Sequence, residues 1–247
     1  MIVNPPKRLL IPHSVLPLVR VFARSAGVED WTDLGSGDGT TVSMCIAGLN
    51  LRSRNAVLLC SDPPKTLAAW TIHNSDVKDW VHKLSGEAGD CVSMFDVLEH
   101  FEKPQGKAIL DKLEAAFRAV VVFTPRGFLK QDAETHPQLR DDPLMWHRSG
   151  FTEQEFADRG YLVFVWPMFH FPPNQRPHGA LLALKLRDVS DTSSMGALRA
   201  ALLCEHRRLL LSTAAFRLFA VRWLLWSALG SRGIRFISER NASVPNT

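Results

Sequence analysis

Apolar residues along the first 190 positions alternate between short continuous runs and a spacing of three to four residues. Continuous runs bounded by polar residues are typical of buried strands, and the longer spacing is typical of amphipathic helices. The predicted strands are 30–34, 56–60, 70–73, 91–95, 119–123, 161–166 and 179–186. The predicted helices are one of about ten residues that Ser14 caps and Gly27 ends, then 42–49, 62–69, 105–118 and 152–159.

The order of these elements predicts the fold class. Strands and helices alternate over the first 125 residues, which favours a parallel sheet with helices on both faces. No helix separates the last two strands, so they are expected to form an antiparallel hairpin. We therefore predict an α/β domain over residues 1–190, a doubly wound, mostly parallel sheet of seven strands with a terminal antiparallel hairpin.

Residues 191–247 have a different composition and are predicted to form a basic, apolar, helical C-terminal extension. Residues 195–247 contain eight arginines, no lysine and two glutamates, whereas the preceding part is slightly acidic. A mostly apolar helix is expected over 195–230. It is interpreted as packing on its own domain or a second subunit, lying on a membrane surface, or binding an acidic polymer. The longest run without a charged residue, 160–175, contains three prolines and predicts no transmembrane helix.

Composition excludes several classes of protein. An apolar fraction of 46% excludes a disordered chain. Four cysteines without a C-x-x-C pair indicate neither a disulfide scaffold nor a zinc ribbon, and reduced thiols fit a cytoplasmic location.

A glycine-rich turn follows the first predicted strand, in the run Asp33-Leu34-Gly35-Ser36-Gly37-Asp38-Gly39. Ligands of open parallel sheets bind at the carboxyl ends of the strands, and glycine lets the backbone approach a ligand closely. The pattern is G-x-G-x-G, because Thr40 stands where a dinucleotide fingerprint needs glycine. A nicotinamide-dependent oxidoreductase is therefore disfavoured, and a purely structural turn is the other interpretation.

Acidic residues follow the next three predicted strands. Asp62, Asp76 and Asp96 come after the second, third and fourth strands respectively. Each alone is explained as a solvated strand end or a helix cap. Together with Asp33 they gather negative charge at one edge of the sheet, which favours a ligand that uses it.

These motifs resemble those of the class I S-adenosylmethionine-dependent methyltransferases, which implies a Rossmann-like fold and S-adenosylmethionine as the cofactor. The glycine run resembles the motif that holds the amino-acid end of the cofactor, Asp62 the ribose-binding acid, and Asp76-Val77 the adenine-contacting pair. Asp96-Val97-Leu98-Glu99-His100-Phe101 resembles the D-V-I-E-H-L motif of one subgroup, and 123–128 its fifth-strand end. The implied cofactor-binding residues are Asp33, Gly35, Ser36, Gly37, Gly39, Asp62, Asp76, Val77 and Asp96.

The resemblance also implies candidates for the chemistry. His100 lies one turn past the fourth strand and titrates near neutrality, as a general base requires. His147 precedes a Phe-Thr helix start in a loop that faces the substrate in the family. With Glu99 they form the predicted catalytic set, and the alternative is that the histidines only pack under the loop. Thr152 and Glu155 are explained by a capping box.

A metal is the other use of these side chains. Asp96, Glu99, His100 and His147 resemble the quartet of the small-RNA 2′-O-methyltransferases, where a divalent ion holds ribose hydroxyls, and such a set suits Mg²⁺ or Mn²⁺. Small-molecule methyltransferases carry the same Glu-His pair, so a site without a metal is our prediction.

The function predicted from the sequence is methyl transfer to a small or carrier-linked acceptor, such as a sugar or lipid intermediate, on oxygen in preference to nitrogen. One alternative is an RNA or protein methyltransferase that uses the basic tail, although nucleic acid is not an expected partner because the body is acidic. Another is a cofactor-binding regulator or membrane-recruited scaffold without turnover. The expected location is the cytoplasm, with contact to a membrane surface or self-association through 195–230.

Overall fold

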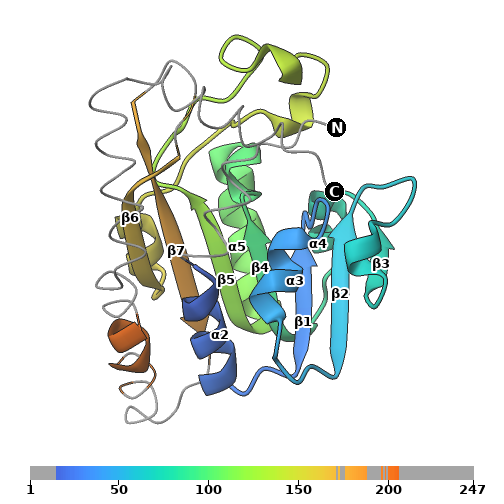
Figure 1. Ribbon diagram of the computed structural model, residues 1–247, viewed down its shortest axis with the longest axis vertical. Coiled ribbons are helices and arrows are strands. Elements are labelled where there is room, and N and C mark those ends of the chain that lie inside the picture. The colour runs from blue at the N-terminus through green and yellow to red at the C-terminus, as the bar shows by residue number, and fades with distance from the viewer. Residues whose placement is uncertain are drawn as a thin grey trace, which may run out of the picture.

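A computed structural model describes residues 15–170, 172, 176–187, 196, 198 and 200–205. Its centre is a seven-stranded sheet in the order β3-β2-β1-β4-β5-β7-β6 (Figure 1). The strands are β1 Asp30–Leu34, β2 Ser53–Leu58, β3 Thr71–Asn74, β4 Gly89–Phe95, β5 Phe117–Pro125, β6 Leu162–His170 and β7 His178–Leu186. Strands β1 to β5 are parallel, and β7 is antiparallel to both β5 and β6. The predicted fold class is confirmed.

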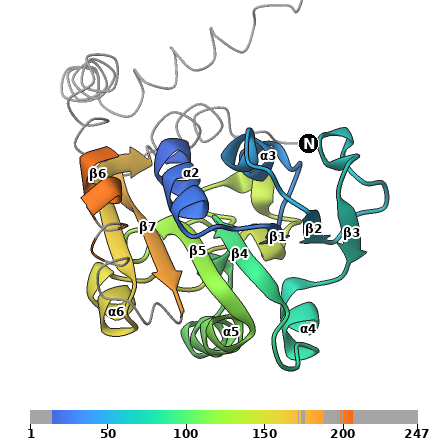
Figure 2. The same ribbon diagram turned by 90° about the horizontal axis from the view of Figure 1, so that it is seen from below.

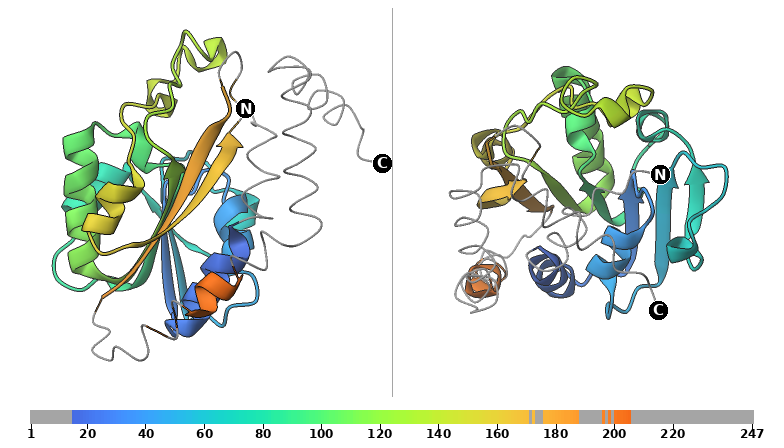
Figure 3. Two further views of the ribbon diagram at one scale, coloured as in Figure 1. Left: turned by 90° about the vertical axis from the view of Figure 1, so that its left-hand side faces the viewer. Right: turned by 45° about the horizontal axis from the view of Figure 1, so that its top comes forward.

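Helices cover both faces of the sheet (Figures 2 and 3). The α-helices are α2 Leu16–Ser25, α3 Thr40–Ile46, α4 Val77–His82, α5 Lys103–Ala116 and α6 Glu153–Asp158. Short 3-10 turns are η1 Lys65–Leu67, η2 Leu98–His100, η3 Pro137–Leu139 and η4 Pro143–Met145. Helices α2 and α3 lie on one face, and α4, α5 and α6 lie on the other. Figure 3 shows this three-layer arrangement with the sheet seen nearly edge-on.

Two apolar cores hold the layers together. Alternate residues of β5 enter each core: Val121 and Phe123 face the α2 side, whereas Val120 and Val122 face the α5 side. All four are buried, and burial of a side chain of this size contributes about 1.5–3 kcal/mol. A strand buried on both faces needs the continuous apolar run from which it was predicted.

Several local predictions differ from the structure. The predicted helix over 62–69 contains only the 3-10 turn η1, and the predicted strand 161–166 extends to His170 as β6. Strand β2 runs from 53 to 58 instead of 56 to 60; beyond its end, the Asn74 side chain hydrogen-bonds the backbone N–H and carbonyl of Cys60. Helix α4 lies where a polar loop was predicted. Its six residues are too few to show a helical spacing of apolar positions. Helix α2 has Val15 at its N-cap position, and Ser14, the predicted cap, lies outside the described residues.

The C-terminal extension is described only at its start. Leu198 and Leu202 are buried in the core on the α2 side, so this part packs on the domain. The remainder of the predicted 195–230 helix lies outside the described residues. Within the described part of the chain, no helix has both the length and the apolar character that crossing a bilayer requires.

Candidate active site

Three segments meet at the carboxyl edge of the central strands. The glycine loop follows β1, the turn η2 follows β4, and the long loop 126–150 follows β5. In Figure 1 this long loop lies above the arrowheads of the strands. Strand β4 pairs with both β1 and β5. The topology therefore brings the glycine motif, the Asp96–Phe101 motif and His147 to one edge, as expected for a parallel sheet.

The glycine loop combines a tight contact with an open position. Gly35 has a φ of 69°, and a Cβ on it would lie 2.6 Å from Cγ2 of Val97. Gly37 has a φ of 55°, and a Cβ there would have no atom within 4 Å. Gly35 is thus required for packing, whereas at Gly37 the backbone is exposed to open space at the edge where a ligand is expected.

Asp33 lies beneath this loop and only 2% of it is exposed. The Ser93 hydroxyl donates a hydrogen bond to its carboxylate and accepts one from the indole of Trp31 at 2.8 Å. Burial raises the pKa of Asp33 to about 7, against the lowering effect of hydrogen bonds from Ser93 and Ser36. With these contacts, the Asp33 side chain stabilises the glycine loop from within the core.

This burial predicts a pH-dependent stability. Between about pH 4 and 7 the folded state holds the Asp33 proton and the unfolded state, with a pKa of 3.8, does not, so stability falls as the pH rises through this window, by up to about 4 kcal/mol. Asp33→Asn keeps an oxygen for Ser93 and removes the titration. Urea unfolding from pH 4 to 8 should show wild type losing stability relative to the variant; a constant difference between the two would contradict this.

The residues predicted to bind the ribose and the adenine of the cofactor follow β2 and β3. Asp62 is exposed and lies four positions beyond the end of β2, because that strand stops at Leu58. Asp76 caps α4 by accepting a hydrogen bond from the backbone N–H of Lys78 at 2.7 Å, and Val77 is buried. Asp76 therefore has a structural role, and the cofactor roles of these three residues remain predictions.

Asp96 links β4 to the histidine motif in an unusual backbone conformation. Its φ of 54° is the one positive value at a non-glycine residue in the part of the chain that the structure describes. Its backbone N–H donates to the carbonyl of Phe123 at 2.8 Å, which fixes the turn. Aspartate tolerates this left-handed region better than most residues, and such outliers gather at functional sites.

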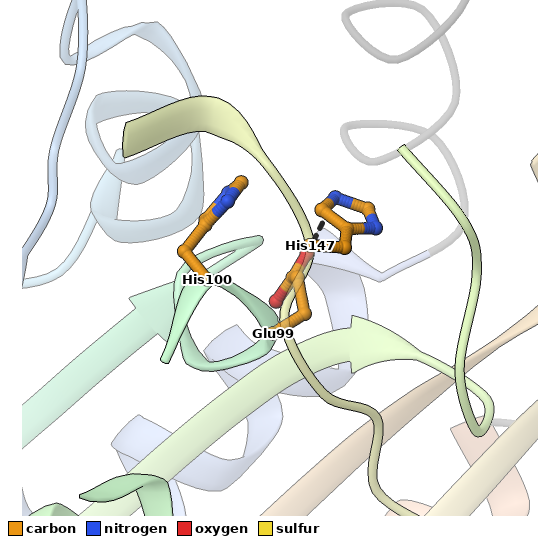
Figure 4. Close-up of side chains that lie close together, drawn as sticks. All are labelled: Glu99, His100 and His147. Carbon is orange, nitrogen blue, oxygen red and sulfur yellow. Dashed lines mark ion pairs between the residues drawn. The ribbon is translucent and has the colours of Figure 1, made fainter. Parts of the chain in front are cut away.

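Glu99, His100 and His147 lie together at the end of β4 (Figure 4). One ligating atom from each lies within 4.8 Å of the others. Oε1 of Glu99 is 3.9 Å from Nε2 of His147, and both side chains are buried, whereas His100 is partly exposed. The predicted catalytic residues are thus brought together in space.

Backbone carbonyls fix the orientation of both imidazoles. Nδ1 of His100 lies 3.1 Å from the carbonyl oxygen of Trp146, and Nδ1 of His147 lies 2.7 Å from that of Leu129. A carbonyl oxygen only accepts, so each neutral ring carries its proton on Nδ1. The lone pair is therefore on Nε2, where it can take a proton or bind a metal.

Two more hydrogen bonds join the histidine loop to η2. The backbone carbonyl of Glu99 accepts from the N–H groups of Arg148 at 2.8 Å and Ser149 at 3.2 Å. The Thr124 hydroxyl donates to Oε2 of Glu99 at 3.0 Å. The sequence analysis included Thr124 in the run 123–128 that resembles the family's fifth-strand end, but gave it no role; its place directly after the predicted strand was the available signal.

The group also fits a divalent metal by its chemistry. Two imidazole nitrogens and one carboxylate oxygen converge, a donor set that suits first-row transition ions better than Mg²⁺. Asp96, the fourth member of the predicted quartet, is outside this group among the described residues. No metal was predicted, and the arrangement makes one a second interpretation of the same three side chains.

A separate hollow of about 740 Å³ opens beside Arg126, Glu153 and His178. Arg126 follows β5, at the start of the long loop that carries His147. Its guanidinium forms an ion pair with Glu153, which raises the pKa of Arg126 and lowers that of Glu153. Arg126 is therefore already neutralised by a neighbour.

No protein-family model matches this sequence, and no curated protein sequence does. Solved structures of similar shape include the methyltransferase domain of bacterial CtHen1, with 16% identity, 71% of this chain and 99% of that chain covered, and a TM-score of 0.47. A SAM-dependent methyltransferase from Archaeoglobus fulgidus has 15% identity, with 69% and 93% covered and a TM-score of 0.47. An O-methyltransferase family protein from Burkholderia thailandensis has 15% identity, with 71% and 56% covered and a TM-score of 0.45. At these values the fold assignment rests on the strand order itself.

Proposed function

We propose that this chain transfers a methyl group from S-adenosylmethionine to an oxygen of a small or carrier-linked acceptor. One observation carries the proposal: the open backbone at Gly37 and the group Glu99, His100 and His147 follow adjacent strands at the same edge of the sheet. The open backbone at Gly37 is suited to a cofactor, and the group of three side chains is suited to an acceptor. No other edge in the described part of the chain combines a motif of each kind.

The residues have distinct roles in the proposed reaction. An acceptor hydroxyl attacks the sulfonium methyl carbon, so a C–O bond forms as the C–S bond breaks, and S-adenosylhomocysteine leaves. The hydroxyl proton passes to Nε2 of His100, which is the partly exposed imidazole of the two. His147 and Glu99 form the buried pair beside it, and the rings of the two histidines have centroids 5.0 Å apart. General-base assistance of this kind contributes about 10²–10⁴ in rate.

Methyl transfer with labelled cofactor tests the proposal. The full chain is incubated with methyl-labelled S-adenosylmethionine and pools of hydroxylated and amine-bearing metabolites, and the methylated product is analysed by mass spectrometry. We expect label on an acceptor oxygen together with stoichiometric S-adenosylhomocysteine. Label only on nitrogen would refute the choice of atom, and cofactor binding without transfer to any pool would favour the non-catalytic regulator.

A second interpretation is that Glu99, His100 and His147 hold a divalent ion. The convergence of their ligating atoms favours it. Such an ion would lower the pKa of a bound hydroxyl, so that no imidazole base is needed. The three side chains would then orient the acceptor instead of accepting its proton.

Mn²⁺ binding followed by electron paramagnetic resonance separates the two interpretations. If the group is a metal site, one Mn²⁺ binds per chain and His147→Ala weakens binding at least about tenfold, as loss of a ligand implies. His136→Ala is the matched control, because His136 is a buried histidine of the same loop that is not in the group. Equal Mn²⁺ binding by both variants, or activity that chelators leave unchanged, would support the imidazole base.

A further inference from the structure

We propose that Thr124 is a positioning residue of the acceptor site, where it fixes the carboxylate of Glu99 relative to His147. The inference rests on the proposed function and adds a residue to it. Thr124 is fully buried near the end of β5, and its hydroxyl donates to Oε2 of Glu99 at 3.0 Å. The other oxygen, Oε1, faces Nε2 of His147 at 3.9 Å.

The backbone alone does not orient this carboxylate. Hydrogen bonds from Arg148 and Ser149 hold the carbonyl of Glu99. The last side-chain torsion of a glutamate, however, has a broad range. A donor on one oxygen selects one orientation within this range. The Thr124 hydroxyl therefore fixes the orientation in which the carboxylate faces His147.

The regular pairing of β5 fixes the position of the Thr124 hydroxyl. Thr124 is paired with Leu181 on β7, within a ladder of seven residue pairs that ends at Pro125. Glu99, by contrast, belongs to a three-residue 3-10 turn, an element with poorer hydrogen-bond geometry. A strand in the middle of the sheet thus supports a carboxylate carried by a short turn, as preorganised sites require.

Three variants separate the hydroxyl from the packing. Thr124→Val keeps the shape and removes the donor, whereas Thr124→Ser keeps the donor and removes a methyl group. Thr32→Val is the matched control, because Thr32 is also a buried threonine on a strand of this sheet, in the middle of β1. Each variant is prepared as the full chain with ¹⁵N-labelled histidine, and the ring nitrogens are observed by NMR without cofactor or acceptor.

We expect Thr124→Val to shift the His147 ring signals, and Thr124→Ser and Thr32→Val to leave them at the wild-type positions. Unchanged signals in Thr124→Val, or equal shifts in Thr124→Ser, would overturn the proposal. With an acceptor in hand, Thr124→Val should lower kcat at least about tenfold and leave S-adenosylhomocysteine affinity unchanged, because the carboxyl group of Glu99 then loses the hydrogen bond that orients it. The chemical shifts of the histidine ring nitrogens are measured without turnover. A failure of the methyl-transfer assay is therefore distinguishable from a failure of the role proposed for Thr124.

Discussion

His100→Ala should reduce kcat for methyl transfer by about 10²–10⁴-fold, the usual contribution of a general base. The reason is geometric. His100 is the partly exposed imidazole of the site, and its Nδ1 proton is donated to the carbonyl of Trp146, so the basic lone pair of the ring is on Nε2. The pH profile of kcat should lose its acidic limb in the variant, because no group then needs to be deprotonated for the reaction.

Controls distinguish this loss from a damaged fold. S-adenosylhomocysteine affinity of His100→Ala should equal that of wild type, because the glycine loop follows a different strand. His136→Ala, in a buried histidine of the same loop, should keep its activity. Rates are measured with the acceptor identified by labelled transfer. A kcat within a factor of three of wild type for His100→Ala would remove His100 from the mechanism.

Gly37→Arg should weaken binding of S-adenosylhomocysteine by more than about 100-fold, a loss near 3 kcal/mol. The substituted side chain enters the open space beside the loop, where no protein atom lies within 4 Å of the Cβ position. It thereby occupies the volume proposed for the amino-acid end of the cofactor, an end that S-adenosylhomocysteine shares with S-adenosylmethionine. Affinities are measured by calorimetry.

Gly86→Arg is a closely matched control. Gly86 has a φ of 68°, is exposed, and has nothing within 4 Å of its Cβ position, so the backbone strain is comparable with that at Gly37. It precedes β4 and therefore lies at the opposite, amino edge of the sheet. Equal affinity losses in the two variants would mean that strain, and not the cofactor site, explains the effect.

The elements that the sequence predicted well are those with long patterns. The run Val120–Phe123 is apolar at every position because both faces of β5 are buried, and this also indicates a central strand. Alternation with helices then predicted the parallel order. Gly35 and Gly37 were identified because a turn at a strand end needs glycine. The position of His147 beside Glu99 was implied by the family resemblance alone.

The remaining features depend on contacts in the folded chain, which the pattern of apolar and polar positions does not show. Asp33 was expected at a ligand-binding edge, yet its side chain is buried and accepts a hydrogen bond from Ser93 on β4, 60 residues away in the sequence. Asp76 looks the same in sequence whether it meets adenine or caps α4. Thr124 is an ordinary strand residue until the fold places it against Glu99. Such roles are set by tertiary neighbours, so the sequence alone could not choose between the interpretations of these residues.

Binding of S-adenosylhomocysteine to the purified full chain tests the central claim most directly. Calorimetric titration of the wild-type chain is predicted to show one saturable site per chain, with binding that Gly37→Arg weakens and Gly86→Arg preserves. If concentrations up to the millimolar range produced no saturable binding to the folded wild-type chain, the assignment of the glycine loop to this cofactor would be contradicted, and the proposed methyl transfer with it.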